Sequence, residues 1–267
     1  MSALIEIPPS SDATAAVVSS LPGGRWNRHR GCWTARRSPA AAARLVDAGL
    51  ADLDEETRRE ADSFRRMEAF RESIRDGSAD LPPIPRSKIE PWRHQIEAYH
   101  WVRSGRSVLN MGMGLGKSKV VVDAVCNGDD ETVLVLCPKA VLGVWRREFS
   151  LWSTRSYTLH VADRGTTAKK AEAIRHFLTT RSGLRIVVAN YESASTGKLA
   201  ELLLKTTWSR VVLDESHRVK TGTTRVGRFA VTLCQAAGTA DLLSGTFLAQ
   251  NPLDGFNQLR CLDEGVF

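Results

Sequence analysis

Strand-like and helix-like stretches alternate along the chain from residue 95 to residue 262, and this alternation limits the folds that the chain can adopt. Apolar, β-branched runs predict strands at Ser107–Asn110, Val133–Cys137, Arg185–Asn190, Arg210–Asp214 and Asp241–Ser244. Stretches of helical periodicity predict helices at Gln95–Ser104, Lys117–Cys126, Val144–Trp152, Ala168–Thr180, Thr196–Leu204, Val226–Ala236 and Pro252–Leu262. Such alternation is typical of an α/β domain with a parallel sheet and helices on both faces. Ligands of such domains bind beyond the C-terminal ends of the strands.

A glycine-rich stretch, MGMGLGKS, lies between the first predicted strand and the helix that follows it. The stretch ends in Gly114, Gly116, Lys117 and Ser118, which follow one another in the order found in a phosphate-binding loop. Glycines let the backbone fold around phosphate groups, and the start of the helix favours an anion. In such a loop the lysine reaches the β- and γ-phosphates and the serine holds Mg²⁺. The alternative is a flexible turn with a chance lysine, and Met111 stands where the common pattern has glycine.

Two adjacent carboxylates end a buried-type strand in the stretch RVVLDESHRVK. A pair of acids at this place is unfavourable unless it serves a cation or a reaction. Asp214 suits binding of Mg²⁺, Glu215 suits orienting and deprotonating a water, and His217 suits coupling to a neighbouring motif. The alternative is a polar helix start, because Asp-Glu-Ser also caps helices. Since the glycine-rich stretch and the acid pair both follow strands of one predicted sheet, hydrolysis of ATP with Mg²⁺ is the favoured interpretation.

Residues 1–80 differ in composition from the rest of the chain. Residues 1–20 are rich in Ser, Ala and Pro and are predicted to be a disordered tail. Residues 21–80 predict a basic β-hairpin followed by a charged helix from about residue 40 to residue 77. The prolines of residues 81–90 predict an extended linker to the α/β domain at residues 91–267.

The hairpin concentrates positive charge in a chain whose net charge is +7. Arg25, Arg28 and Arg30 alternate there with Trp26 and Trp33. This combination suits nucleic acid, because arginines pair with phosphates and indoles stack on bases. The alternative is a solvated basic hairpin with its Trp side chains buried.

Some classes of protein are disfavoured. No apolar run is long enough to span a membrane, and the N-terminus lacks the pattern of a secretory signal. We therefore expect a protein that is not secreted and that acts in the cytoplasm or wherever its DNA is, such as a nucleoid or a viral replication site. The cysteines are scattered without a C-x-x-C pair, which argues against a zinc site or a disulfide framework.

Motif by motif, residues 91–267 resemble the superfamily 2 helicase-type motors, and more narrowly the Swi/Snf-related DNA translocases. The stretches that carry the resemblance are PWRHQIEAYHW, NMGMGLGKS, VLVLCPKAVLGVWRREFSLW, VVANYES, DESH and LLSGTFLAQNPLDGFNQLRCLDEGVF, in the family's order. A non-glycine residue at the position of Met111 is usual in that family. The resemblance implies a RecA-like P-loop domain, the first of two lobes, and a DNA-dependent ATPase of the helicase or translocase type.

The resemblance also implies a role for each residue of the nucleotide site. It assigns the adenine to Arg93 and Gln95, the phosphates to Gly114, Gly116, Lys117 and Ser118, Mg²⁺ to Ser118 and Asp214, and hydrolysis to Lys117, Asp214, Glu215 and His217. A buried glutamine bonded to the backbone is the alternative for Gln95.

On the DNA side, the resemblance implies a contact surface and a coupling loop. The residues that it places toward the DNA backbone are Pro138, Lys139 and Tyr191. The residues that it assigns to linking the ATP state with the grip on DNA are Ser244, Gly245 and Thr246. Core packing is the alternative for Tyr191 and Trp145. Phe247 stands where the family usually has proline, so the shape of that turn is open.

The N-terminal stretch LPGGRWNRHRGCWTARRSP is similar to the small β module that precedes the motor in annealing-helicase (HARP-type) proteins. This similarity implies that the basic hairpin, with Arg25, Arg28 and Arg30, engages branched DNA or a junction of single and double strands.

Motors of this family hold ATP between two RecA-like lobes, and the second lobe supplies arginine fingers. The sequence shows no second-lobe motif, so we expect a second lobe on another polypeptide. The preferred interpretation is half of a DNA-dependent ATPase, from a split gene, a two-subunit motor or a truncation. The alternatives are a non-catalytic module that binds ATP or DNA, and an unrelated phosphate-loop ATPase.

Overall fold

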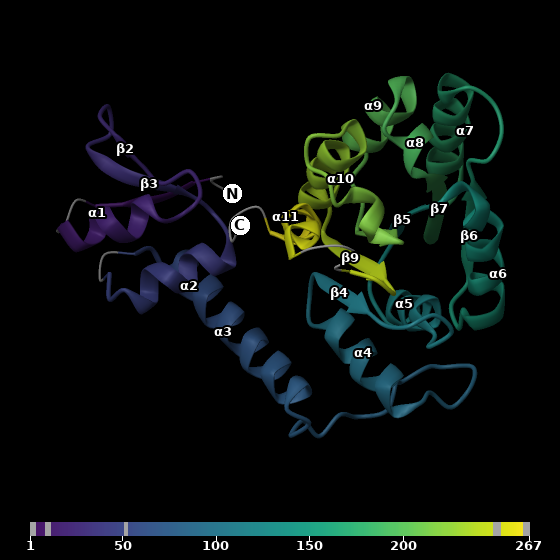
Figure 1. Cartoon of the computed structure of the whole chain (residues 1–267), viewed down its shortest axis with the longest axis horizontal. Coiled ribbons are helices and arrows are strands. Elements are labelled where there is room, and N and C mark those ends of the chain that lie inside the picture. Colours follow the sequence, from purple (N-terminus) through teal and green to yellow (C-terminus); the bar gives the residue numbers. More distant parts are fainter. Residues whose placement is uncertain (1–3, 9–11, 51–52, 248–251, 264–267) are drawn as a thin grey trace. The chain divides into compact units, whose positions relative to one another are not determined.

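The computed structural model describes residues 4–8, 12–50, 53–247 and 252–263. The chain forms two compact units, each with its own core: Met1–Ala79 with Asp263–Phe267, and Asp80–Leu262 (Figure 1). Among the helices in the described ranges, none is both long and apolar enough to cross a membrane.

The larger unit is built on a parallel sheet, which confirms the predicted α/β fold (Figure 1). In order across the sheet, the strands are β4 (Ser107–Asn110), β9 (Thr239–Ser244), β8 (Arg210–Asp214), β5 (Thr132–Cys137), β7 (Leu184–Asn190) and β6 (Tyr157–Val161). Alternate residues of a strand face opposite sides, so Leu134 and Leu136 pack into one core while Val133 and Val135 pack into the other. Both faces of the sheet are therefore buried, as is usual for parallel sheets.

Helices cover both faces of this sheet (Figure 1). The helices that contribute to one core are α4 (Arg93–Arg103), α5 (Lys117–Cys126) and α6 (Leu142–Trp152). Those that contribute to the other are α7 (Thr167–Thr180), α9 (Gly197–Lys205), α10 (Arg225–Ala236) and α11 (Phe256–Leu262). The short elements are α8 (Tyr191–Ala194) and the 3-10 turns η1 (Lys139–Val141), η2 (Ser216–Val219) and η3 (Pro252–Gly255).

Strand β6, at one edge of the sheet, is missing from the sequence prediction. All of its residues are half-buried, because only one neighbouring strand, β7, pairs with it. Thr158 and His160 alternate with apolar residues, which is the pattern of a half-buried edge strand, and a prediction based on continuous apolar runs overlooks it.

A buried ion network joins three strands at the N-terminal end of the sheet. Arg210, at the start of β8, donates through Nε to Asp130 at 3.0 Å and through Nη1 to Asp241 in β9. Ser107 in β4 donates to the other carboxylate oxygen of Asp241 at 2.6 Å. Because all of these side chains are buried and each charge has a partner, the network favours this one order of strands.

The smaller unit combines an antiparallel sheet with helices. Its strands in sheet order are β1 (Leu4–Ile7), β3 (Cys32–Arg36) and β2 (Arg25–Asn27), and its helices are α1 (Asp12–Ser19), α2 (Pro39–Asp47) and α3 (Glu55–Arg75). β2 and β3 form the predicted hairpin, in which Trp26 pairs with Trp33. Gly31 takes a φ of 62° in the turn, a conformation that favours glycine.

The expectation of a disordered tail is wrong for the described part of residues 1–20. Residues 4–7 form β1, which pairs with β3, and residues 12–19 form α1. Ile5 and Ile7 are buried in the core of this unit. An alternation of two isoleucines is too short a pattern to predict a strand, and the strand forms because β3 supplies its hydrogen-bonding partner.

The charged stretch of residues 40–77 forms two helices instead of the expected one. Gly49 ends the first with a left-handed φ of 73°. Asp54 caps the second, since its carboxylate accepts a hydrogen bond from the amide of Thr57 at 2.6 Å. The ion-pair periodicity of α3 hides this break in the sequence.

Candidate functional site

Three of the predicted loops meet at the C-terminal edge of β4, β9 and β8. In the register of the sheet, Asn110 pairs with Ser244 and Asp214 pairs with Leu243. The amide of Met111 extends this register by donating to the carbonyl of Ser244 at 3.1 Å. Neighbouring strands lie about 4.8 Å apart. The structure therefore brings the glycine-rich stretch, the acid pair and the loop after β9 to one edge of one sheet.

The glycine-rich stretch forms an open loop that leads into α5. Gly114 and Gly116 take left-handed φ values of 80° and 86°, and Gly116 is the N-cap of α5. No atom lies within 4 Å of the place that a Cβ on Gly114 would occupy. Lys117 and Ser118 are the first residues of the helix, both half-buried. The loop thus leaves space at the positive end of a helix, which suits an anion.

Lys117 bonds to its own loop in this structure. Its Nζ donates to the carbonyl of Met111 at 2.8 Å and to that of Gly112 at 3.1 Å. These bonds hold the ammonium group beside the open side of the loop. A phosphate that entered the loop would compete with two neutral carbonyls for this charge, and hydrogen bonds between charged groups are the stronger ones.

The side-chain amide of Gln95 forms hydrogen bonds with backbone groups. Its Oε1 accepts from the amide of Trp92 and its Nε2 donates to the carbonyl of Leu115, both at 3.2 Å. The residue is 6% exposed, and a Cβ on Gly116 would lie only 2.4 Å from Nε2. The alternative interpretation therefore holds in this structure, because the amide expected to read adenine instead joins α4 to the glycine-rich loop.

The residues around Gln95 lie nearer the surface. Arg93 is exposed, and its Nε donates to Glu97 at 3.0 Å along α4. His94, which sequence reasoning missed, places Nε2 3.2 Å from the carbonyl of Leu115. Trp92 packs against the ring of His94 with centroids 5.5 Å apart. A single histidine beside a motif carries no signal of its own, so its contact is visible only in the structure.

Asp214 ends β8 as a half-buried carboxylate. Trp145 donates through Nε1 to its Oδ2 at 2.9 Å. Burial raises the pKa of Asp214, whereas the bond from Trp145 and the more distant charge of Lys117 lower it. No Lys or Arg of the described residues forms an ion pair with this carboxylate, which suits the binding of a cation such as Mg²⁺.

Glu215 adopts an unusual backbone conformation. Its φ and ψ are both 54°, and it is the only non-glycine residue with positive φ in the described part of the chain. Such a conformation costs about 1–3 kcal/mol and is concentrated at functional sites. The Oε2 atom of Glu215 lies 3.3 Å from Nδ1 of His217. This is a close contact without hydrogen-bond alignment, since Nδ1 has no hydrogen-bond partner.

Trp145 and Tyr191 both lie in the core and hold Asp214. Each is 1% exposed. The hydroxyl of Tyr191 donates to the backbone carbonyl of Asp214 at 2.7 Å, and burial raises the pKa of this tyrosine far above its usual value. The expectation that Tyr191 lies toward DNA is therefore wrong for its side chain, and the core-packing alternative holds for both aromatics. Their role is to position the acid from behind the sheet edge.

The loop after β9 lies against the glycine-rich stretch. Ser244 is fully buried, and its Oγ accepts from the amide of Thr246 at 3.0 Å. The place of a Cβ on Gly245 lies 3.6 Å from the carbonyl oxygen of Met111. The residues predicted to couple ATP state to DNA grip thus adjoin the glycine-rich loop.

Gln258 is a site residue that sequence reasoning missed. This buried side chain of α11 accepts a hydrogen bond from Ser216 Oγ at 2.7 Å and donates to the carbonyl of Phe247 at 2.9 Å. It therefore connects the turn after the acid pair with the loop after β9. A helical glutamine gives no signal of this kind in the sequence, because its partners lie 42 and 11 residues away.

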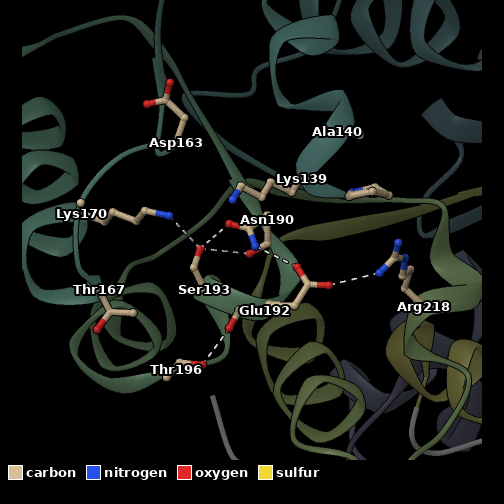
Figure 2. A pocket seen from close by; sticks show the side chains of 12 residues that line it. Lys139, Ala140, Asp163, Thr167, Lys170, Asn190, Glu192, Ser193, Thr196 and Arg218 are labelled. Carbon is tan, nitrogen blue, oxygen red and sulfur yellow. Dashed lines mark hydrogen bonds and ion pairs between the residues drawn. The ribbon is translucent and has the colours of Figure 1, made fainter.

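A pocket of about 650 Å³ opens beyond the C-terminal ends of β5 and β7, at the other half of the same sheet edge (Figure 2). Pro138 and Lys139, both predicted to lie toward DNA, line it. Its other charged lining residues are Asp163, Lys170, Glu192 and Arg218. Lys170 had no predicted role, and it comes from α7 outside every motif.

Polar contacts run across one wall of this pocket (Figure 2). Glu192 accepts from Asn190 Nδ2 at 2.8 Å and from Arg218 Nη1 at 3.1 Å. Ser193 donates to Asn190 Oδ1 at 2.5 Å and accepts from Lys170 Nζ at 3.3 Å. Hydrogen bonding from Asn190 is the main cause that lowers the pKa of Glu192, with smaller contributions from a backbone hydrogen bond and the charge of Arg218 and against the effect of burial, so this residue is a carboxylate at neutral pH.

In the smaller unit, the predicted DNA-contacting arginines are on the surface of the hairpin. Arg25, Arg28 and Arg30 are exposed, and Arg30 forms an ion pair with Glu6. Trp26 is 40% exposed and packs edge-on against Trp33 with centroids 5.6 Å apart. The partly exposed ring of Trp26 and the guanidinium groups of Arg25 and Arg28 are therefore accessible to a ligand, and Arg30 is exposed but paired with Glu6.

The described residues hold no group of three His, Cys, Asp or Glu side chains that would bind a metal by itself. A cation at Asp214 would take most of its ligands from phosphate oxygens and water, which is the usual way that Mg²⁺ is bound beside a nucleotide.

Comparison with known proteins gives a consistent result. A family model described as the SNF2-related domain matches residues 83–267. A SWI/SNF-related matrix-associated actin-dependent regulator of chromatin subfamily A-like protein 1 homolog of Caenorhabditis elegans is 26% identical over 188 residues, which cover 70% of this chain. A probable global transactivator of Orgyia pseudotsugata multicapsid polyhedrosis virus is 30% identical over 172 residues, which cover 60% of this chain.

The chain spans only part of these relatives. The match covers 26% of the nematode protein and 33% of the viral protein. Among solved structures, the Sulfolobus solfataricus SWI2/SNF2 ATPase core in complex with dsDNA superposes with a TM-score of 0.57 at 20% identity. That match covers 70% of this chain and 38% of the solved chain, and at this identity it supports the fold.

Proposed function

The chain belongs to the SNF2-related domain family, and from this premise we propose that it is the first RecA-like lobe of a DNA-dependent ATPase motor. It binds ATP with Mg²⁺ and DNA, and it needs a second RecA-like lobe, on another polypeptide, for efficient hydrolysis and for translocation or annealing. The observation that supports this most is the shared edge of β4, β9 and β8, where the charge of Lys117 is near enough to Asp214 to lower the pKa of that carboxyl group.

The residues of this edge fit a magnesium-bound triphosphate. Gly114 leaves open space ahead of α5, and Lys117 carries a charge held only by carbonyls. Ser118 and Asp214 provide the hydroxyl and the carboxylate that Mg²⁺ prefers. When bound, Mg²⁺-ATP supplies the phosphoanhydride that is cleaved and the charge that neutralises its oxygens.

The other side chains act on the water and on the loops. Glu215 orients and deprotonates the attacking water, and His217, whose Nδ1 lies 3.3 Å from that carboxylate, couples it to the neighbouring loop. Ser244, Gly245 and Thr246 transmit a change at the phosphate loop, because the loop after β9 lies against Met111.

A second lobe would complete the site from its open side. Met113 is 91% exposed and Leu115 is 40% exposed at the tip of the glycine-rich loop, so an apolar surface is available there for another domain. An arginine finger from such a lobe contributes about 10³–10⁵ in rate. The chain alone should therefore bind nucleotide and turn it over slowly.

A non-catalytic binding module is the second candidate function. The observation in its favour is that Lys117 and Gln95 are both bonded to the backbone of the loop. The strained Glu215 beside an acid that lacks an ion-pair partner argues for hydrolysis instead, because a binding module has no need of a reactive carboxylate.

Nucleotide binding by wild-type and Lys117→Ala chains tests the phosphate site. We expect calorimetry with Mg²⁺-ATP to show saturable binding by the wild type and none by the variant, since the ammonium group is the main positive charge of the loop. Undiminished binding by the variant would mean that the loop is misassigned.

Turnover separates the two candidate functions. Purified chain is mixed with a second-lobe polypeptide of the same family, and phosphate release is measured with and without duplex or forked DNA. We expect stimulation by DNA in the mixture. A folded chain that binds nucleotide but shows no release in any mixture would favour the binding module.

The N-terminal unit is proposed to be a HARP-like DNA-binding module. Its support is the exposed set of Arg25, Arg28 and Arg30 beside the accessible ring of Trp26. Changing the three arginines to glutamine should weaken DNA binding and reduce its salt slope by up to about 0.9 for each phosphate that is no longer neutralised. The same change at Arg59, Arg65 and Arg66 of α3 is the matched control. An equal salt slope in both variants would show that the hairpin arginines do not contact DNA and that the hairpin only packs within its unit.

A further inference from the structure

We propose that the ion pair between Glu192 and Arg218 is a relay by which a nucleic-acid phosphate in the pocket of Figure 2 acts on the turn that carries Glu215 and His217. This inference rests on the proposed function and concerns how its two ligands regulate each other. Neither residue has a role in that proposal so far.

The pocket contains positive charge that the protein does not neutralise. Lys170 is 8% exposed, and its amine reaches the hydroxyl of Ser193 at 3.3 Å. Burial lowers the pKa of Lys170 and the charge of Lys139 lowers it further, whereas Asp163 raises it, so the two ammonium groups are close enough to repel each other and the pocket's acid offsets this only in part. Among the described residues, neither lysine forms an ion pair with a carboxylate. A phosphate group between them would relieve this repulsion, and a phosphodiester is the form of phosphate that fits the proposed partner.

The same pocket contains a carboxylate that a bound phosphate would repel. Glu192 lies on the pocket wall and is ionised, since hydrogen bonding from Asn190 and the charge of Arg218 lower its pKa. A phosphate near Lys139 would repel Glu192 and attract Arg218. The Glu192–Arg218 pair is roughly half exposed on both sides, and ion pairs of that exposure are weak. An arginine bound to a phosphate makes stronger, charge-assisted bonds.

Arg218 connects the pocket with the acid pair. It belongs to η2, and its amide donates to the carbonyl of Glu215 at 3.0 Å. Glu215 is the residue with the left-handed backbone, so the turn is held in a conformation that a small displacement can relax. A shift of Arg218 toward a phosphate is therefore passed to Glu215 through one backbone hydrogen bond.

The far side of η2 is fixed, which directs this motion. Ser216 bonds to Gln258 at 2.7 Å, and Lys220 pairs with Asp254 at 3.2 Å. The carbonyl of Val219 accepts from Asn257 of α11. With these anchors in place, a pull on Arg218 reorients the exposed side of the turn and does not detach it from α11.

Linkage between the two ligands tests the relay with the chain as it is. The affinity for a non-hydrolysable ATP analogue with Mg²⁺ is measured by calorimetry, with and without saturating duplex DNA, and the affinity for DNA is measured by fluorescence anisotropy. Binding of either ligand must change the affinity of the other by the same factor, which is about 5–150-fold in typical coupled sites. We expect at least about fivefold coupling in the wild type.

The variants are Glu192→Gln and Arg218→Gln. Glu192→Gln should bind DNA more tightly, because it removes a negative charge from the pocket, yet its coupling should fall to within about twofold of none. Arg218→Gln should lose the coupling and bind DNA more weakly. Tighter binding without coupling is a signature that simple damage to the fold does not give. Glu201→Gln on α9 is the control, since Glu201 forms an exposed ion pair with Lys198 and should keep the wild-type coupling.

The outcomes separate the relay from the proposed function. If the wild type binds both ligands and couples them, but both variants couple them equally well, the relay is overturned and the proposed function stands. Independent binding of the two ligands by the wild type overturns the relay as well. A wild-type chain that binds no DNA or no nucleotide overturns the proposed function and the relay together. Arg218→Lys keeps the charge and should retain part of the coupling, which guards against a misfolded Arg218→Gln chain.

Discussion

The two ends of strand β8 both carry a charged residue, and the protein neutralises only one of them. Arg210 begins the strand, is buried, and is paired with Asp130 and Asp241. Asp214 ends the same strand and receives a hydrogen bond from the indole of Trp145, with a pKa raised by burial.

This difference distinguishes a structural charge from a functional one. At the N-terminal edge of the sheet, the charges of Arg210, Asp130 and Asp241 are matched within the chain, so the network stabilises one strand order. At the C-terminal edge, Asp214 and the pocket lysines Lys139 and Lys170 lack ion-pair partners among the described residues. For Lys170, which is buried, and Asp214, which is partly buried, an unmatched charge is costly in the free protein, and that cost is recovered when a ligand of opposite charge binds.

The largest change in unfolding free energy is expected from Arg210→Leu, which tests the paired end of β8. Removing the cation leaves Asp241 and Asp130 buried without their partner, and breaking such a network costs about 3–5 kcal/mol of unfolding free energy. Urea denaturation measures this loss. Arg164→Leu, at an exposed arginine, is the control and should change stability by less than about 0.5 kcal/mol. If Arg210→Leu changed stability as little as the control, Arg210 would not be a structural charge.

A smaller loss is expected from Ser107→Ala. This change removes the 2.6 Å hydrogen bond to the buried carboxylate of Asp241, and an unsatisfied buried group costs about 1–3 kcal/mol. The same denaturation experiment measures it. Ser182→Ala, at an exposed serine before β7, should leave the midpoint unchanged. An equal response at both serines would show that the network tolerates the loss of one donor.

Asp214→Asn is expected to act in the opposite direction. Replacing a half-buried acid that has no ion-pair partner by a neutral amide should stabilise the free chain at neutral pH, by about 0.5–2 kcal/mol as is common for substitutions at functional positions. The Mg²⁺-dependent part of nucleotide affinity should be lost. Thermal unfolding without Mg²⁺ and calorimetry with it measure the two effects. Asp129→Asn, at an exposed position, should show neither. Destabilisation by Asp214→Asn would show that this acid has a structural role, as Asp241 does.

The smallest effect on stability is expected from Lys170→Ala. Because burial and Lys139 already disfavour this ammonium group, its removal should change the unfolding free energy by less than about 0.5 kcal/mol. Its effect should appear in DNA binding, where the salt slope should fall by about 0.9 if one phosphate is no longer neutralised. Lys205→Ala, at the exposed end of α9, is the matched control. A large loss of stability with an unchanged slope would make Lys170 a structural residue.

The strand pattern of the sequence was sufficient for the sheet and for the loops at its C-terminal edge. β4 and β8 have the expected bounds, because short apolar runs between turn residues leave little freedom for their ends. The edge strand β6 and the terminal strand β1 were missed, since both are short and lack the continuous apolar run that marks the central strands.

The site was harder to predict than the sheet, because a motif gives residue types and not their partners. Gln95 and Tyr191 stand where the pattern places ligand contacts, yet their polar groups bond to the backbone of Leu115 and Asp214. Lys170 contributes from outside every motif, and Gln258 contributes from within one but at a position to which no role had been assigned. Such contacts depend on which helix faces which loop, and that is decided by the packing of the whole unit.

The carboxamide of Gln95 ties the segment ahead of α4 to the glycine-rich loop. Its Oε1 accepts a hydrogen bond from the amide of Trp92, and its Nε2 donates one to the carbonyl of Leu115. The segment ahead of Trp92 is itself anchored to the larger unit, because Ile84 is buried in its core and Arg86 donates to the carbonyl of Cys126 at 3.3 Å. The glycine-rich loop is therefore braced by a fixed segment, and a displacement of that segment would reach the loop through a single carboxamide.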